Sequence, residues 1–545
     1  MATPRSGGHL LVECLAAQGV DRVFCVPGES YLDVLDGLYD SQIDVINARQ
    51  EGGAAMMAEA DGKMTGRPGI CLVTRGPGAT NASSGLHIAA QDSTPMILLV
   101  GQIGRSMRGR EAFQEVDYKR FFGGMAKWVE EIDQADRIPE ILSHAYHIAL
   151  SGRPGPVVLA LPEDMLRDPT ERPPGPFVEV AAPAPATQDM ARLQTLLAQA
   201  ERPFLILGGS RWRASDIAAI QTLAEKWRLP VGCSFRRQGL FDAHHPCYAG
   251  DVGLGINPSL KERIAEADLI LLLGARLSEN PSQSFTLLDI PKPAQTLVHI
   301  HPGPEELGRI YVPDLAINAT PGTFINAALQ LGFTPPWTDE TAKIHQAYLD
   351  WSAEPPKGIG AVTLSQTMTS LRQALPEDAV MTNGAGNYAA WLHRFHRYRP
   401  ATQLGPTSGS MGYGLPAAIA GALRQPDREV FCFAGDGCFQ MTGMEFGLAA
   451  ERSLKTRVLV CDNGTYGTIR MHQEKTYPGR PMATRLANPD FAAWAQSYGA
   501  LGLTVDADSD FPDALAQARS APGPVLIHLK LDARDIAPGR VLDND

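Results

Sequence analysis

The segment that most constrains this chain is an apolar run that stops at a Gly-Asp-Gly turn, Phe431-Cys-Phe-Ala-Gly-Asp-Gly437. A second apolar run, Arg457–Cys461, stops at Asp462-Asn463, and Asn463 follows Asp436 by 27 positions. Both runs are typical of buried strands. The stretch 441–454 between them mixes apolar and charged residues and is a predicted crossover helix. The two strands are therefore predicted to be parallel neighbours.

Polar groups follow the ends of both predicted strands. Parallel neighbours end at the same edge of a sheet, so the side chains of Asp436 and Asn463 and the main-chain carbonyl of Thr465 are predicted to converge on one cation. All three groups offer oxygen atoms, which suit Mg²⁺ or Ca²⁺. The sequence therefore predicts a site for a divalent metal ion.

The Gly-Asp-Gly turn also has the features of a phosphate site. Gly435 and Gly437 allow close approach of the backbone, and the N–H groups of Gly437 and Cys438 open the following helix, where an anion is favoured. A metal ion beside a helix N-terminus can hold a diphosphate. Gly-Asp-Gly by itself is a common turn, so an ordinary strand-ending loop is the alternative interpretation. The second turn at Asn463 favours the metal site.

Composition limits the classes of function. A chain of 545 residues has room for about three or four domains, and 44% hydrophobic residues are ordinary for globular cores. The formal charge is −12 and the sequence has no block of Lys and Arg residues, so it indicates no basic surface for binding nucleic acid or an anionic membrane. The eight cysteines include no Cys-x-x-Cys pair, and the N-terminal residues lack an apolar targeting core. We expect a cytoplasmic protein that acts on a small molecule.

Helix and strand patterns alternate along three stretches of the chain. This alternation predicts an α/β architecture of three doubly wound parallel-sheet domains. We expect the domains at residues 1–167, 188–333 and 361–545. Residues 168–187 are rich in Pro and Ala, and residues 334–360 contain Pro-Pro-Trp and Glu-Pro-Pro, so both are predicted to be linkers.

The Gly-Asp-Gly turn with its spaced Asn resembles the cofactor motif of thiamine-diphosphate-dependent enzymes. That family carries an Asn-Asn pair whose second member binds the metal; Asn463 matches it, while Asp462 replaces the first member. The three predicted domains are similar in order to the pyrimidine-binding, central and diphosphate-binding domains of acetohydroxyacid (acetolactate) synthases, over essentially the whole chain. The resemblance implies thiamine diphosphate and Mg²⁺ as cofactors, with Asp436, Asn463 and Thr465 as metal ligands.

Glu51 follows a predicted strand at the start of a helix. A glutamate in a first helical turn is by itself explained by the helix dipole. The surrounding segment, 47–59, resembles the family's Arg-His-Glu segment, whose glutamate hydrogen-bonds the thiamine aminopyrimidine and promotes deprotonation of the thiazolium carbon. The resemblance makes Glu51 the candidate catalytic group, and a dry pocket raises a carboxyl pKa enough for proton exchange near neutrality. Gln50 stands where the family has His, so no relay through that His is expected.

Three further segments resemble family loops that hold the cofactor. Gly409-Ser-Met411 opens a stretch like the family's Gly-Thr-Met-Gly-Phe-Gly-Leu-Pro-Ala-Ala. By this match the Gly409 carbonyl accepts from the 4′-amine and Met411 separates the two rings; a lone Met would be core filler. Asn387 and Tyr388 replace the Gln-His pair that holds the diphosphate, and both still donate hydrogen bonds. The loop of Pro77 and Asn81 resembles the family loop beside the pyrimidine, although a bare Pro-Gly turn means little.

Two further segments resemble those that contact the substrate in acetohydroxyacid synthases. The run Ala112-Phe113-Gln114-Glu115-Val116-Asp117, followed by Lys127, resembles the Ala-Phe-Gln-Glu-x-Asp…Lys run of acetohydroxyacid synthases. The resemblance implies that Phe113, Gln114 and Lys127 line the substrate channel; an ordinary surface loop is the alternative. Gly28 and Glu29 stand where those enzymes carry Gly-Gly near the reacting carbon, so Gly28 is a candidate site residue and Glu29 adds a second carboxylate.

The central domain departs from the family pattern. The arginine that those enzymes use for the carboxylate of the acceptor is replaced by Asn280, which removes a cation. His301 stands where the family has the Asp of His-Ile-Asp, and His cannot offer a carboxylate to a ribose. FAD is therefore a weaker expectation than thiamine diphosphate and Mg²⁺.

We predict a thiamine-diphosphate- and Mg²⁺-dependent enzyme, similar to acetolactate synthase large subunits, that decarboxylates a pyruvate-like 2-oxo acid and joins the product to a carbonyl acceptor. The alternatives are a 2-oxo acid decarboxylase that releases an aldehyde, a flavin-dependent oxidase and a non-catalytic relative. Product analysis with and without an added acceptor separates the carboligase from the simple decarboxylase, and a yellow protein would indicate bound flavin. Glu51 and Asp436 lie in separate domains that meet across a subunit interface in this family, which implies a homodimer or homotetramer.

Overall fold

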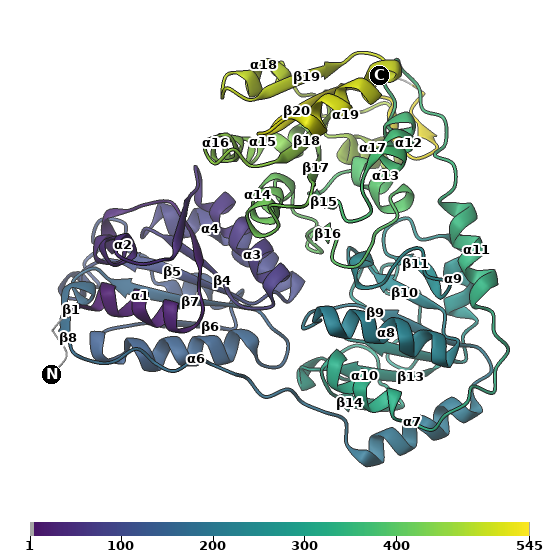
Figure 1. The fold of residues 1–545 in the computed structure, drawn as a ribbon, viewed down its shortest axis with the longest axis horizontal. Coiled ribbons are helices and arrows are strands. Elements are labelled where there is room, and N and C mark those ends of the chain that lie inside the picture. Colours follow the sequence, from purple (N-terminus) through teal and green to yellow (C-terminus); the bar gives the residue numbers. More distant parts are fainter. Residues whose placement is uncertain (1–4, 544–545) are drawn as a thin grey trace. The chain divides into compact units, whose positions relative to one another are not determined.

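The computed structural model describes residues 5–543. They fold into two compact units. The first unit contains the chain up to residue 181 together with residues 419–424 and 442–452, and the second contains residues 182–418, 425–441 and those from 453 onward. In Figure 1 the colours follow the chain from purple at the N-terminus to yellow at the C-terminus.

The first unit is built on a six-stranded sheet in which every neighbouring pair of strands is parallel, in the order β3-β2-β4-β5-β7-β6. In Figure 1, α1 and α6 lie along one face of this sheet and α3 and α4 along the other. The strands are β2 (Arg22–Cys25), β3 (Asp44–Asn47), β4 (Gly69–Val73), β5 (Met96–Gln102), β6 (Trp128–Glu131) and β7 (Pro156–Pro162). The helices are α1 (Gly7–Ala17), α2 (Leu32–Tyr39), α3 (Glu51–Thr65), α4 (Pro77–Asp92), α5 (Tyr118–Phe122) and α6 (Ile138–Leu150).

The second unit begins with the central sheet, which is also parallel throughout and has the order β11-β10-β9-β12-β13-β14. Its strands are almost wholly apolar, as expected where helices cover both faces; β12 reads Leu-Ile-Leu-Leu-Leu and is buried throughout. The strands are β9 (Pro203–Leu207), β10 (Val231–Ser234), β11 (Tyr248–Val252), β12 (Leu269–Leu273), β13 (Thr296–His301) and β14 (Leu315–Asn318). The helices are α7 (Thr187–Gln199), α8 (Ala214–Trp227), α9 (Pro258–Ala265), α10 (Pro321–Leu329) and α11 (Thr341–Trp351).

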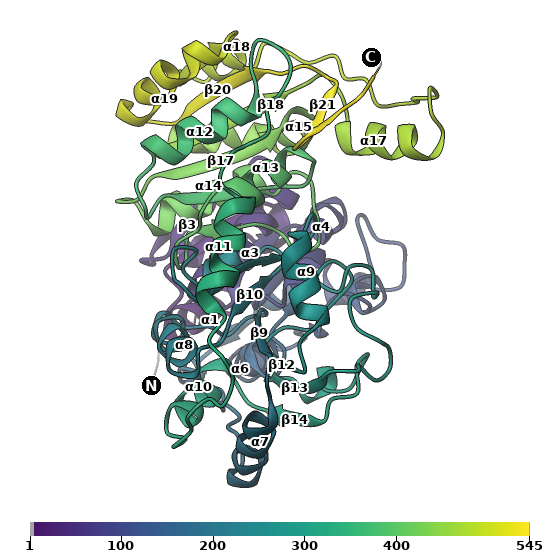
Figure 2. The same ribbon diagram turned by 90° about the vertical axis from the view of Figure 1, so that its right-hand side faces the viewer.

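The third sheet has the order β16-β15-β17-β18-β20-β19 and is again parallel throughout. Its strands are β15 (Val380–Asn383), β16 (Gln403–Leu404), β17 (Val430–Gly435), β18 (Thr456–Asp462), β19 (Leu501–Val505) and β20 (Val525–Lys530). Its helices are α12 (Leu364–Ala374), α13 (Tyr388–Phe395), α15 (Asp436–Gln440), α17 (Gly467–Thr476), α18 (Phe491–Gln496) and α19 (Phe511–Ser520). The second half of α14 (Gly414–Arg424) and all of α16 (Phe446–Glu451) fall in the late segments of the first unit. Figure 2 shows α17 beside the short hairpin strand β21 (Asp535–Ala537), which pairs with β22 (Arg540–Val541).

The first and third sheets share one topology. When the strands of each sheet are numbered from its own first strand, both have the order 2-1-3-4-6-5, whereas the central sheet has the order 3-2-1-4-5-6. In open parallel sheets, ligands bind beyond the carboxyl ends of the strands where the strand order reverses. The reversal lies between β2 and β4, between β9 and β12, and between β15 and β17. We therefore expect one crevice in each sheet, at this reversal, in which loops can form a site.

The structure confirms the predicted fold class of three doubly wound parallel sheets. The two strands on which the metal prediction depends, β17 and β18, are parallel neighbours, with Gly435 opposite Cys461. The expected crossover helix between them is shorter than predicted: a 3₁₀ turn at Gly443–Glu445 precedes α16.

The segment predicted as the second linker, 334–360, contains α11. The helix forms because it has an apolar side to bury: Tyr348 is buried and its ring packs edge-on against that of Tyr248 at 4.8 Å. His345 on the same helix hydrogen-bonds the carbonyl of Tyr248 through Nδ1 at 2.9 Å. The first expected linker, 168–187, carries β8 (Pro169–Thr170), which pairs with β1 (Arg5–Ser6), and ends at the start of α7.

Two late segments of the chain, 419–424 and 442–452, belong to the first unit and are held there by charged groups. The guanidinium of Arg424 contacts both Asp61 and Asp21. Arg452 donates to Asp44 at 3.0 Å. These ion pairs join residues about four hundred positions apart in sequence. Among residues 5–543, no helix has the length and apolar character needed to cross a lipid bilayer.

Candidate cofactor site and catalytic residues

Asp436 is the first residue after β17, at the reversal of strand order between β15 and β17. Its carboxylate is buried, with 3% of the residue exposed. Oδ1 accepts from the main-chain N–H of Gly437 at 2.8 Å, and Oδ2 accepts from Nδ2 of Asn488 at 2.7 Å. Burial raises the pKa of Asp436 to about 6. A buried carboxylate in this environment is stabilised by a bound cation.

Asn463 and Thr465 lie in the turn that follows β18. Gly464 has a φ of +63°, a conformation that glycine adopts without a steric penalty. The turn brings the Asn463 Oδ1 within 3.3 Å of the Thr465 N–H, and the Thr465 carbonyl accepts from the N–H of Gly467 at 2.8 Å. Each of these oxygens keeps a free lone pair. With Asp436 they offer carboxylate, amide and carbonyl oxygens, the donor set that fits Mg²⁺.

The glycines around Asp436 allow two tyrosine rings to lie close to the backbone at this edge of the sheet. A Cβ on Gly435 would lie 2.8 Å from the ring of Tyr388, and a Cβ on Gly437 would lie 2.5 Å from the ring of Tyr466. Side chains at these two positions would displace the rings that pack beside Asp436. The hydroxyl of Tyr388 donates to Cys438 Sγ at 3.2 Å, so it is directed into the protein. The main-chain N–H of Gly412 also donates to Cys438 Sγ at 3.2 Å.

The other candidate diphosphate and ring contacts lie in the same unit. Asn387 starts α13 and is paired with Thr468 of α17, through its N–H and its Oδ1, both at 3.0 Å. Gly409 has a φ of +68° and open space around its Cα. Met411 is half-buried against the core of the third sheet, so both its predicted ring contact and its interpretation as core filler fit its position.

Glu51 is the first residue of α3, in the first unit. The N-terminus of this helix is capped by Gln50, whose side-chain oxygen accepts from the N–H of Gly53 at 3.1 Å. Asn81 on α4 donates to Glu51 Oε2 at 2.9 Å. A Cβ on Gly78 would lie 3.3 Å from Glu51 Oε1, so the first turn of α4, which begins at Pro77, approaches the carboxylate closely. The structure therefore brings the predicted residues Glu51, Pro77 and Asn81 together.

Glu445 is a buried carboxylate beside Glu51 that the sequence analysis does not identify. It is fully buried, and its oxygens accept from the main-chain N–H groups of Arg49 and Gln50 at 3.0–3.1 Å. A Cβ on Gly53 would lie 2.4 Å from Glu445 Oε1, so only glycine fits there. Burial, with the nearby charge of Glu51, raises the pKa of Glu445 to about 7. Glu445 thus fixes the backbone that leads into α3.

Glu445→Gln is expected to flatten the pH dependence of stability between about pH 4.5 and 7. The carboxyl pKa is 4.5 for a free side chain and about 7 in the folded protein. In this window the folded state binds more protons than the unfolded state, so the free energy of unfolding falls as pH rises. The linkage amounts to about 1–3 kcal/mol. Gln keeps an oxygen for the two N–H groups without the charge. The measurement is the free energy of unfolding in urea at several pH values from 5 to 8. The same change with pH in wild type and variant would contradict this assignment.

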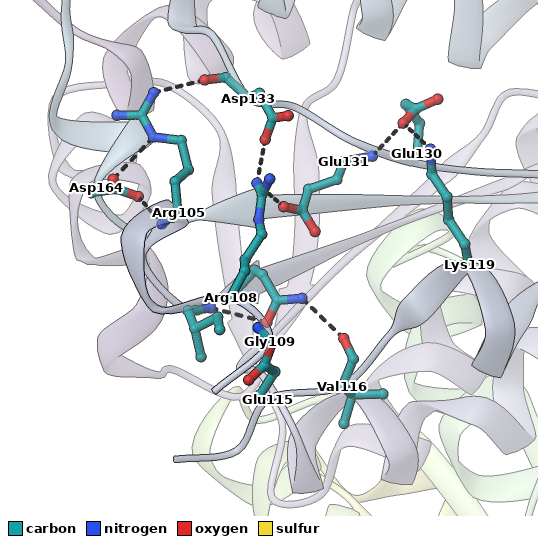
Figure 3. A network of polar contacts seen from close by, with 12 residues as sticks. Arg105, Arg108, Gly109, Glu115, Val116, Lys119, Glu130, Glu131, Asp133 and Asp164 are labelled. Carbon is teal, nitrogen blue, oxygen red and sulfur yellow. Dashed lines mark hydrogen bonds and ion pairs between the residues drawn. The ribbon is translucent and has the colours of Figure 1, made fainter. Parts of the chain in front are cut away.

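The loop that carries Phe113 and Gln114 is braced by polar contacts (Figure 3). Arg105 donates to the Asp164 carboxylate through its N–H and Nε, both at 2.9 Å. Arg108 pairs with Glu131 and Asp133. Glu115 closes the loop on itself by accepting from the N–H groups of Gly109 and Ala112 at 2.7 and 2.9 Å.

The braced loop presents its two predicted channel residues differently. Phe113 is 75% exposed. Gln114 has a φ of +65°. A Cβ placed on Gly76 would lie 2.7 Å from the Cβ of Gln114. Gln114 is therefore packed against the loop that approaches Glu51, whereas the aromatic ring of Phe113 is free to meet another surface.

Lys127 and Gly28, two further predicted site residues, both make close contacts within the protein. The ammonium of Lys127 donates to three carbonyl oxygens, those of Ile148, Ser151 and Arg153, at 2.5–2.8 Å, at the C-terminus of α6. Any contact with substrate would require Lys127 to leave these carbonyls. A Cβ on Gly28 would lie 2.4 Å from Thr74, so glycine is required for the close approach of the loops after β2 and β4.

Glu29 and the two central-domain histidines, His299 and His301, are held by contacts within the protein. Glu29 accepts from Arg75 at 3.0 Å, and Arg75 also donates to Glu163 at 3.1 Å. His299 and His301 are buried, and their rings bond the main chain at Ala275 and Gly303 respectively, each at 3.0 Å. Burial lowers the pKa of His299 to about 4.

Comparison with known proteins places this arrangement in a family. The chain matches the N-terminal TPP binding domain of thiamine pyrophosphate enzymes over residues 5–121, their central domain over 190–328 and their C-terminal TPP binding domain over 384–529. The chain therefore belongs to the thiamine pyrophosphate enzyme family, and thiamine diphosphate is its cofactor.

Within that family the chain is an acetolactate-synthase-like enzyme. It is 32% identical to the large subunit of acetolactate synthase isozyme 1 of Escherichia coli K12, over 97% of this chain and 94% of the relative. It is 29% identical to the isozyme 2 large subunit of the same organism, over 97% of this chain and 96% of the relative. The acetolactate synthase of Bacillus subtilis is 29% identical over 97% of this chain and 94% of its own length.

Proposed function

We propose that this protein uses thiamine diphosphate and Mg²⁺ to decarboxylate a pyruvate-like 2-oxo acid and to join the product to a carbonyl acceptor. The observation that carries the proposal is Glu51 at the start of α3, with Oε2 held by Asn81 and Oε1 close to the first turn of α4 at Gly78. The oxygen set after β17 and β18 supports it from the diphosphate side. The similarity to acetolactate synthases over nearly the whole chain names the reaction class.

Bound thiamine diphosphate supplies an electron sink for the carbanion left when CO₂ departs. The residues of this chain position it and move the proton. Asp436, Asn463 and Thr465 would hold Mg²⁺ and, through it, the diphosphate. Glu51 would exchange a proton with the pyrimidine through Oε1, because Oε2 is already bonded to Asn81.

Two groups of residues are proposed as further contacts. The cofactor contacts are Pro77, Asn81, Asn387, Tyr388, Gly409, Met411, Gly435, Gly437 and Cys438. The substrate contacts are Gly28, Phe113, Gln114 and Lys127. The position of Gln114 against Gly76 supports a role near Glu51, whereas the three hydrogen bonds of Lys127 make it the weakest member of the second group.

A second candidate function is decarboxylation that ends with release of an aldehyde. The specific observation is Asn280, which stands in the loop after β12 where a guanidinium would otherwise recognise an acceptor carboxylate. Its main-chain carbonyl accepts from Nε2 of Gln283 at 3.0 Å. An acceptor without a carboxylate, or a proton, would then replace the 2-oxo acid. FAD is not part of the proposal.

We further propose a homodimer or homotetramer in which Glu51 of one subunit serves the diphosphate site of another. The exposed ring of Phe113 supports such an interface. The eight cysteines are buried and free, which supports a cytoplasmic, reducing environment.

The test is CO₂ release from pyruvate by protein loaded with thiamine diphosphate and Mg²⁺, with acetolactate and acetaldehyde quantified. Acetolactate would establish the carboligation. CO₂ with acetaldehyde alone would establish the decarboxylase. No turnover with pyruvate or with a panel of longer 2-oxo acids would overturn the proposed donor class.

A further inference from the structure

Asn488 lies between the buried carboxylate of Asp436 and the half-buried carboxylate of Asp462. Its Nδ2 donates to Asp436 Oδ2 at 2.7 Å and to Asp462 Oδ1 at 2.6 Å. Its Oδ1 accepts from Nε2 of Gln440 at 2.8 Å. The side-chain amide therefore uses both N–H groups and its oxygen. Its orientation is determined, because the reversed amide would place an oxygen against two carboxylates.

Asp462 is held from its other side. Its Oδ2 is 2.8 Å from Nε2 of His528, and its Oδ1 also accepts from the N–H of Gly464 at 3.0 Å. Burial opposes ionisation of Asp462, but the hydrogen bonds from His528 and Asn488 outweigh it and hold its pKa below the usual range. Asp462 thus makes protein contacts through both oxygens.

Two neighbouring carboxylates in a buried site repel each other unless donors separate them. A chain with asparagine at position 462 would have one carboxylate here, whereas this chain has two. Asn488 is the group that donates to both. Its two N–H groups satisfy one oxygen of each carboxylate, and each carboxylate oxygen has a second lone pair. Asp436 is therefore fixed in orientation while part of its acceptor capacity stays available to a cation.

We propose that Asn488 is a positioning residue for the metal ligand Asp436, and that Asp462 and His528 serve to hold Asn488 rather than to bind the metal. This inference rests on the proposed function, because it assumes that Asp436 binds Mg²⁺. Residues that orient metal ligands in this way typically change metal affinity by about 10–100-fold when they are removed.

The test is the Mg²⁺ affinity of the full-length protein with thiamine diphosphate present, measured by calorimetry and by tryptophan fluorescence. Trp494 is a suitable reporter because its ring packs edge-on against Phe439 of α15 at 5.3 Å. Asn488→Ala is expected to raise the Kd for Mg²⁺ by about 10–100-fold. Turnover at saturating Mg²⁺ should return towards the wild-type value, because the ligand Asp436 is still present.

Two variants separate positioning from mere loop stability. Asp490→Ala lies two residues away and removes the N-cap of α18, where Asp490 Oδ1 accepts from Ala492 and Ala493 at 3.0 and 3.1 Å. It is expected to lower the melting temperature without changing Mg²⁺ affinity. Gln440→Ala removes only the bond that orients the amide, at an exposed residue, and is expected to weaken Mg²⁺ binding by a smaller factor.

Asp462→Asn keeps an oxygen that can accept from Asn488, so its Mg²⁺ affinity should stay close to that of wild type. An unchanged Mg²⁺ affinity in both Asn488→Ala and Gln440→Ala would overturn the positioning role. Failure of the wild-type protein to bind Mg²⁺ at all would instead overturn the metal site of the proposed function, so the two failures are distinguishable.

Discussion

Glu51→Gln is expected to lower turnover with a 2-oxo acid by about 10²–10⁴-fold, the usual contribution of a positioned proton-transfer group. Glutamine has nearly the same shape and can remain next to Asn81, but it cannot exchange a proton with a ring nitrogen. Affinity for thiamine diphosphate and Mg²⁺ should be retained, because the diphosphate and metal loops lie elsewhere in the chain. The measurement is CO₂ release at saturating cofactor, with cofactor binding followed by calorimetry.

Asn81→Ala is the matched control for this prediction. It removes the hydrogen bond of 2.9 Å that orients Glu51 but leaves the carboxylate. Its effect should be smaller, about tenfold, and it should be rescued in part by Asn81→Gln. A Glu51→Gln enzyme that turns over within twofold of wild type would remove Glu51 from the mechanism.

Asp436→Ala is expected to weaken Mg²⁺ binding by more than about 100-fold, beyond the range typical of residues that only orient a ligand. The carboxylate is the one charged group among the three proposed ligands, and charge dominates the affinity for a hard cation. Thiamine diphosphate should then bind poorly at any accessible Mg²⁺ concentration. Equilibrium dialysis with Mg²⁺ and the cofactor measures both losses.

A melting curve of the metal-free variant is the control, since it shows whether Asp436→Ala is folded. Comparison with Asn488→Ala ranks the two roles: a direct ligand should lose more affinity than the residue that positions it. Equal losses in the two variants would argue that Asp436 does not contact the metal.

The same two variants test the proposed subunit arrangement. In a two-fold dimer whose sites combine Glu51 of one chain with Asp436 of the other, a mixed dimer of Glu51→Gln and Asp436→Ala chains has one intact site. Random co-assembly should then restore about a quarter of wild-type activity. Sites formed within one chain would give no restoration.

The parts of this protein that follow from local patterns were predictable. Apolar runs of strand length, separated by helical segments, define three parallel sheets, and the end of a buried strand is where a polar residue such as Asp436 is conspicuous. Glu51 does not stand out in this way, because a glutamate in a first helical turn is ordinary, and its candidate role came from a resemblance.

Residues whose role depends on distant partners were not predictable. Glu445 accepts from Gln50, which precedes it by 395 positions, and in sequence it is one of several charged residues on an apparent amphipathic helix. Asn488 donates to Asp436 across 52 positions from a loop with no pattern of its own. The role of Lys127 at the end of α6 likewise depends on carbonyls that no motif marks.

The strand order of the central sheet has a consequence for how this enzyme can diversify. Its reversal lies between β9 and β12, and the loop that carries Asn280 follows β12. A Cβ on Gly209 would lie 1.9 Å from the carbonyl of Gly274, so the two loops of this crevice are packed backbone against backbone. If Asn280 faces the acceptor as proposed, acceptor choice would change by exchange of residues on that pair of loops, while Glu51 and Asp436, which belong to other loops, would stay as they are.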